Sequence, residues 1–176
     1  YNQLRVTEIT GNAGDLLIKN EEISIDIDIL TGRNPQSDLQ IQELSGNLTF
    51  NPNLLRLENT MLKTQNSEIK DYLSFEFDSI GSFSNFLEEV TLEIHLDQST
   101  LALADIRLFV PSLAQKDDRL ILSGNVRGTI SDFASEDFLL ELGEKTKVGG
   151  SFELKGLPDI DETFIRLSLE NSIINS

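Results

Sequence analysis

The chain has 176 residues, of which 30 are acidic and 14 basic, and its formal net charge is −16. The acidic residues are spread along the whole chain, and neither nucleic acid nor an anionic membrane surface is bound well without clustered Lys or Arg. Cysteine is absent, which excludes disulfides, thiolate metal sites and a cysteine nucleophile. Hydrophobic residues make up 39% of the chain, a share that favours a folded protein over a disordered one.

The length fits one compact unit or one section of a longer array. The sequence does not begin with Met, and it contains neither a basic-then-apolar leader nor an apolar run near the ~20 residues of a membrane-spanning helix. We therefore expect residues 1–176 to form a single segment, a fragment of a much longer protein.

Several segments alternate apolar and polar residues with the two-residue period of a β-strand. In residues 21–30, EEISIDIDIL, the alternation predicts one face made of Ile23, Ile25, Ile27 and Ile29. The same pattern recurs at Leu73, Phe75 and Phe77; at Val90, Leu92, Ile94 and Leu96; at Phe152 and Leu154; and at Phe164 or Ile165, Leu167 and Leu169. Half-apolar strands of this kind are typical of an antiparallel sheet with one dry face and one wet face.

Short segments rich in turn residues separate these strands, so we expect short connections. The predicted turns are residues 31–38, 51–53, 114–119 and 149–151. Two stretches have helical spacing, residues 82–89 and 103–113, and both are too brief to form a helical layer. The predicted fold class is therefore all-β, an elongated antiparallel sheet with one or two short helices, and the alternative is a closed β-sandwich.

Three segments share an apolar-x-Gly-x-apolar pattern: ELSGNLTF at 43–50, ILSGNVRGTI at 121–130 and KVGGSFELKGL at 147–157. Repeated strand units that cannot bury their own apolar face must stack on their neighbours, which produces elongated sheets. Chance similarity between strands of any antiparallel protein explains the pattern equally well.

No complete constellation for catalysis or metal binding is present. His95 is the sole histidine and lies on the polar side of a predicted strand, which favours a surface role over catalysis or metal ligation. Asp26 and Asp28 alternate with isoleucine and so belong to a wet face, while PDIDET at 158–163 lacks the glycine turn and terminal Glu of an EF-hand loop. We therefore expect a protein that is not an enzyme, with no cofactor and no metal.

Four segments, taken in order, resemble the TamB/AsmA-like envelope proteins, in particular those of Bacteroidota. They are LENTMLKTQNSEIKDYLSFEFDS, FSNFLEEVTLEIHLDQSTLALADIRLFVPSL, LILSGNVRGTISDF and VGGSFELKGLPDIDETFI. The resemblance runs from about residue 43 to residue 174. Its most specific parts are SGNVRGTISDF and KGLPDIDETFI, whereas the alternating strands between them are generic.

This resemblance implies a periplasmic protein anchored in the inner membrane by an N-terminal helix and reaching toward an outer-membrane barrel partner of the BamA/TamA type. It also implies a long β-sheet curled into an open taco-like groove, which shields phospholipid during transport from inner to outer membrane and during outer-membrane assembly. Neither the anchor nor the partner-binding end can be placed on any residue of this chain, and no nucleic acid is expected as a partner.

Twelve apolar side chains are the candidate lining of the groove. They are Ile23, Ile25, Ile27, Phe75, Phe77, Leu92, Ile94, Leu122, Val126, Phe152, Leu154 and Leu167. Each of them could equally line a closed core. A closed β-sandwich acting as a binding or adhesin module is therefore the alternative function, although the chain has no Trp and only Tyr1 and Tyr72 for the aromatic platforms of sugar-binding modules. A hydrolase on a β scaffold is disfavoured by the lack of partners for His95.

Overall fold

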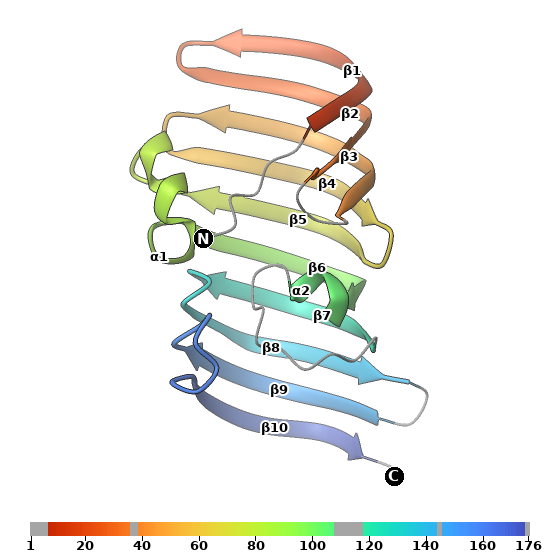
Figure 1. Ribbon diagram of the computed structural model, residues 1–176, viewed down its shortest axis with the longest axis vertical. Helices are drawn as coiled ribbons and strands as arrows, with labels where there is room; N and C mark the ends of the chain where they lie inside the picture. Colours follow the sequence, from red (N-terminus) through yellow and green to blue (C-terminus); the bar gives the residue numbers. More distant parts are fainter. Residues whose placement is uncertain (1–6, 36–38, 108–117, 144–145, 175–176) are drawn as a thin grey trace.

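The computed structural model describes residues 7–35, 39–107, 118–143 and 146–174, and this part of the chain forms an all-β fold. Ten antiparallel strands pair in chain order within one sheet. Figure 1 shows the strands stacked along the long axis of the molecule and curving across it. Strands β1 and β10 lie at opposite ends of this order and do not pair with each other, so the described strands form an open sheet rather than a closed β-sandwich.

The strands are long, and most connections between them are short. The strands are β1 (Thr7–Lys19), β2 (Glu22–Arg33), β3 (Gln40–Asn51), β4 (Leu54–Thr64), β5 (Glu68–Glu76), β6 (Thr91–Ala102), β7 (Arg119–Gly128), β8 (Asp132–Leu142), β9 (Thr146–Lys155) and β10 (Phe164–Ile174). Each alternating segment of the sequence overlaps one of these strands, because the period of two lets a strand bury one face and solvate the other. Phe77 and Val90, at the ends of two segments, lie just outside β5 and β6. The predicted turn at 51–53 is confirmed, and there the Asn53 amide donates to Asn51 Oδ1 at 3.0 Å.

Both helical predictions fall on short helices. The stretch predicted at 82–89 lies within a 3₁₀-helix, η1 (Ile80–Asn85), and the α-helix α1 (Phe86–Glu89) that follows it directly. The second stretch begins as α2 (Leu103–Ile106), and its continuation at 108–113 lies outside the described residues, as do residues 114–117 of the turn predicted at 114–119.

The predicted turn at 149–151 is wrong, because Gly149, Gly150 and Ser151 all lie inside β9. Gly150 has φ +148, and a Cβ at this position would lie 1.9 Å from the Ser168 carbonyl oxygen on β10. These glycines therefore allow close approach of the neighbouring strand without interrupting β9.

A line of β-bulges crosses the middle of the sheet. Each of the nine strand pairs has at least one register shift. Most shifts lie in mid-strand, whereas that between β5 and β6 lies at the start of β5 and that between β9 and β10 lies near the end of β10. The shared glycines of the three similar segments, Gly46, Gly124 and Gly150, lie on this line, and all three have positive φ. Because a bulge bends its strand and increases the local twist, a row of aligned bulges bends the whole sheet along one line. We call it the bend row.

The bulge in β2 also corrects one prediction. The register of β2 shifts between Ile27 and Leu30, so Leu30 rather than Ile29 joins the apolar side chains packed around Ile27. Ile29 is displaced to the opposite face and is exposed. The isoleucine face of residues 21–30 therefore ends at Ile27.

The hydrophobic core lies on one face of the central strands. Ile27, Leu57 and Leu73 are buried together. Partly buried side chains pack around them: Ile25, Leu30, Leu44, Leu48, Leu55, Leu62, Ile69, Phe75 and Ile94. Within the described residues, strands pack mainly against their neighbours in the sheet, and no second sheet or helical layer covers this face.

Candidate functional site

Cross-strand pairing arranges apolar side chains in rows that run perpendicular to the strands. Directly paired residues of antiparallel strands point to the same face, so the row can be followed from pair to pair. The first apolar row contains Ile18, Ile23, Phe50, Leu55, Phe75, Leu92, Gly128, Phe133, Leu154 and Ile165. It crosses all ten strands without a polar residue.

The second apolar row lies two residues further along each strand. It contains Leu16, Ile25, Leu48, Leu57, Leu73, Ile94 and Val126, and it continues through Phe152 and Leu167. On β8 it meets a bulge and the small residue Ser135, which pairs with Phe152. We call the side of the sheet that carries both rows the apolar face.

The structure places all twelve predicted lining residues on or beside the apolar face. Ile23, Phe75, Leu92 and Leu154 belong to the first row, and Ile25, Ile94, Val126, Phe152 and Leu167 belong to the second. Ile27 lies on the bend row, and Leu122 lies beyond it on β7, paired with Leu140. Phe77 follows β5 and packs edge-to-face on Phe83, with ring centroids 4.8 Å apart.

Exposure of the apolar face changes along the sheet. In the centre, Leu57 and Leu92 are each 7% exposed, whereas Ile18 on β1 is 64% exposed and Ile165 on β10 is 60% exposed. The central side chains are buried because strands and bulges on both sides surround them. At both ends the same rows continue with their side chains open to solvent.

A short insertion covers the apolar face near its middle. Residues 78–90, which include η1 and α1 and which we call the cap, join β5 to β6 at one edge of the sheet (Figure 1). The Phe86 ring lies 6.1 Å from that of Phe75, a first-row residue, and 6.0 Å from Phe83. Four phenylalanines therefore form one cluster where the first row passes under the cap.

The opposite face of the sheet is dominated by polar side chains. Asn47 Nδ2 donates to Asp26 Oδ1, and Asn125 Nδ2 donates to both carboxylate oxygens of Asp137 at 3.1 and 3.2 Å. Arg166 and Glu153 form an ion pair at 2.9 Å. Such contacts order solvent-facing side chains, but each exposed pair stabilises the fold little.

His95 also belongs to the polar face. Its ring stacks on Tyr72 with centroids 4.6 Å apart, and its Nε2 lies 3.2 Å from Glu93 Oε1. Nearby on the neighbouring strand, a hydrogen bond from Lys70 at 2.7 Å lowers the pKa of Glu68 below its ordinary value. The contacts with Tyr72 and Glu93 hold the His95 ring on the polar face.

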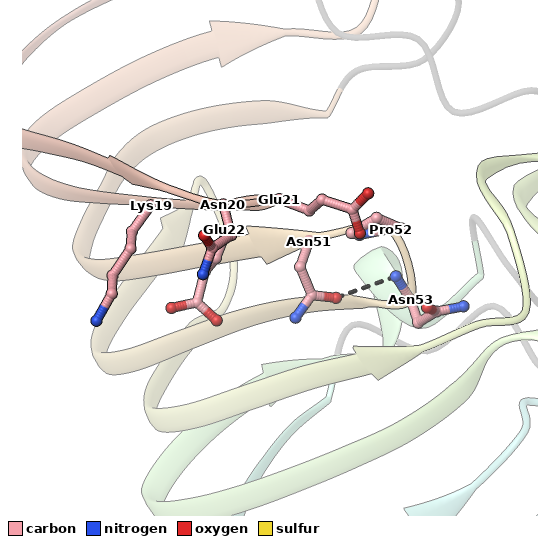
Figure 2. Close-up of a pocket in the computed structure, with 7 residues that line it drawn as sticks. All are labelled: Lys19, Asn20, Glu21, Glu22, Asn51, Pro52 and Asn53. Atoms are coloured by element: carbon pink, nitrogen blue, oxygen red, sulfur yellow. Dashed lines mark hydrogen bonds between the residues drawn. The ribbon is translucent and has the colours of Figure 1, made fainter.

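Polar hollows lie at the turns, away from the apolar face. Figure 2 shows one between the β1–β2 and β3–β4 turns, lined by Lys19, Asn20, Glu21, Glu22, Asn51, Pro52 and Asn53. In the acidic turn at 158–163, Asp159 Oδ1 accepts from the Asp161 amide at 3.1 Å. No group of three or more His, Cys, Asp or Glu side chains suited to hold a metal occurs among the described residues.

Comparison with known proteins identified no relatives. The chain matched no family model, no curated protein and no solved structure. None of the helices in the described ranges is both long and apolar enough to cross a membrane.

Sequence reasoning missed about half of the two rows. The members that the alternation did not assign are Leu16, Ile18, Leu48, Phe50, Leu55, Leu57 and Phe133. Leu73 was assigned to the face of Phe75 but not to the candidate lining, and Ile165 was left open against Phe164. Leu48, Phe50, Leu55 and Leu57 could have been found from the turn at 51–53, because a tight hairpin pairs residues at equal distances from its turn. Leu16 and Ile18 lie in an apolar run, LLI at 16–18, that has no alternation to reveal a face.

Proposed function

We propose that this chain is a non-catalytic segment of a TamB/AsmA-like periplasmic protein, and that its sheet forms an open taco-like groove for phospholipid acyl chains. The observation that carries the proposal is the pair of apolar rows that crosses the whole sheet while no described element covers it as a second layer. In this role the chain serves lipid transport from the inner to the outer membrane and outer-membrane assembly.

The energetics of acyl chains in water explain why a transport protein needs such rows. Exposing hydrocarbon to water costs about 0.8 kcal/mol per CH₂, so a ~16-carbon chain is opposed by on the order of 10 kcal/mol. A continuous apolar surface removes most of this barrier. Ten strands at a spacing of ~4.8 Å provide a surface on the order of 45 Å long.

The exposure of the side chains indicates where a bound acyl chain would cover the most apolar surface. In the centre, the apolar side chains already bury one another and the cap covers part of the first row. Toward β1 and β10 the same rows expose large side chains, among them Ile18 and Ile165. Acyl chains bound at the two ends would cover this surface and would continue the apolar contact across the sheet.

The remaining parts of the proposal concern the rest of the protein. The inner-membrane anchor and the contact with a BamA/TamA-type barrel belong to segments outside this chain. The net charge of −16 fits a section that stays soluble between the membranes and is not drawn onto anionic head groups.

The proposal is tested by titrating the purified chain with a fluorescent zwitterionic phospholipid. Ile165 and Phe164 are neighbours on β10 with similar exposure, 60% and 55%, but only Ile165 lies on the apolar face. Ile165→Asp should weaken binding roughly tenfold, since losing one large apolar contact costs about 1.5 kcal/mol or more. Phe164→Asp should leave binding unchanged. Equal effects of both substitutions, or no saturable binding by the unaltered chain, would contradict the proposal.

A further inference from the structure

The cap is fastened to two other turns at its edge of the sheet. Asn53, in the β3–β4 turn, donates through Nδ2 to the carbonyls of Phe77 at 3.2 Å and Asp78 at 2.9 Å. At the other side, the Ser131 amide in the β7–β8 turn donates to the Leu87 carbonyl at 3.0 Å. The cap therefore spans the strand ends from the β3–β4 turn to the β7–β8 turn, across β4, β5, β6 and β7.

The cap packs against the apolar face through side chains. Val90 is completely buried, Phe77 is 5% exposed, and Phe83 and Phe86 pack on Phe77 and Phe75. Phe83 itself remains 39% exposed. Through these contacts the cap covers the ends of the central strands beside the middle of the first row.

The cap lacks the features that make a helix stable on its own. Its two helices have six and four residues, and neither has a side-chain hydrogen bond at its N-cap. Isolated helices of this length are unstable in water, so the cap depends on its aromatic contacts and on the few hydrogen bonds to the neighbouring turns. Elements held by so few contacts open at much lower free energy than a ladder of paired strands.

We propose that the cap is a lid that controls sideways entry of acyl chains into the middle of the apolar face. This inference rests on the proposed function. In the present structure the lid is closed. Moving it outward breaks the hydrogen bond between Ser131 and Leu87 and separates Phe86 from Phe75, which uncovers the first row at β5 and β6 and leaves every strand pair intact.

The absence of cysteine allows the lid to be locked with a single engineered disulfide. The double variant Leu87→Cys with Ser131→Cys joins the cap to the β7–β8 turn at the residues that already share a hydrogen bond. Uptake of a fluorescent phospholipid from phosphatidylcholine vesicles should slow at least tenfold when the disulfide is formed, and reduction should restore the original rate. The control pair Leu17→Cys with Ser24→Cys crosslinks β1 to β2 on the polar face and should not change uptake.

A second variant tests the lid without a crosslink. Phe83→Ser removes the edge-to-face contact with Phe77 and should increase the uptake rate several-fold, because the lid opens more often. Uptake that is unchanged both by the formed disulfide and by Phe83→Ser would overturn the lid while leaving lipid binding intact. Failure of the unaltered chain to take up any lipid would instead overturn the proposed function, and the lid with it.

Discussion

The centre and the two ends of the apolar face are built from the same pattern but differ in burial. Leu57 and Leu73 in the centre and Leu16 at one end all belong to the second row, yet the first two are buried and the third is largely exposed. The alternation of apolar and polar residues therefore does not by itself determine how deeply a side chain of the row is buried. The side chains contributed by neighbouring strands on both sides decide it, since an end strand has a neighbour on one side only.

This difference separates two roles that one apolar row can fill. In the centre, apolar side chains contact one another and stabilise the curved sheet. At the ends, equivalent side chains contribute little to folding and remain available to cover a ligand. Stability and lipid binding should therefore respond to substitutions in different parts of the same row.

The largest expected effect is the loss of stability caused by a substitution in the centre of the apolar face. Leu57→Ala should lower the free energy of unfolding by about 2–5 kcal/mol, because it removes buried methyl groups and leaves a cavity. Leu16→Ala, in the same row on β1, should change it by less than about 1 kcal/mol. Urea unfolding of both variants measures the difference. Equal losses would show that the end strand is as well packed as the centre.

Substitutions in the bend row should have the next largest effect on the free energy of unfolding. A Cβ at Gly124 would lie 1.9 Å from the Asp137 carbonyl oxygen, and its φ of +125 is unfavourable for any L side chain, so Gly124→Ala should cost about 1–3 kcal/mol. Gly14→Ala is the matched control on β1, where the nearest atoms are 3.9 Å away. Thermal unfolding compares the two. A neutral Gly124→Ala would mean that the bend does not depend on glycine.

Much of the fold could be predicted from the sequence, and the predictions that the structure corrects have one physical cause. Alternation located strands such as β2, β5 and β6, because burying one face of a sheet requires a period of two. A bulge changes the phase by one residue, and the bulge of β2 between Ile27 and Leu30 contains no glycine that would mark it in the sequence. For this reason the alternation predicted Ile29 rather than Leu30 on the apolar face, and Gly149–Ser151 suggested a turn where β9 continues.

The candidate site was predicted in part for the same reason. Residues with clear alternation, such as Ile25 and Leu92, were found, whereas Ile18 was not, because only its pairing with Ile23 assigns it to a row. The choice between Phe164 and Ile165 was open in the sequence and is decided by the pairing of Ile165 with Leu154. The lipid itself has no signature in the residues and stays a proposal.

The most direct test of the central claim is photo-crosslinking at two adjacent positions of β1. Leu17 and Ile18 are 62% and 64% exposed, but Ile18 pairs with Ile23 on the apolar face and Leu17 pairs with Ser24 on the polar face. Each is replaced in turn by the photoreactive residue p-benzoylphenylalanine, the chain is irradiated with phosphatidylcholine vesicles, and lipid adducts are measured by mass spectrometry. We expect adducts at position 18 and few at position 17. Equal yields at both positions, or none at either, would contradict a lipid-binding apolar face.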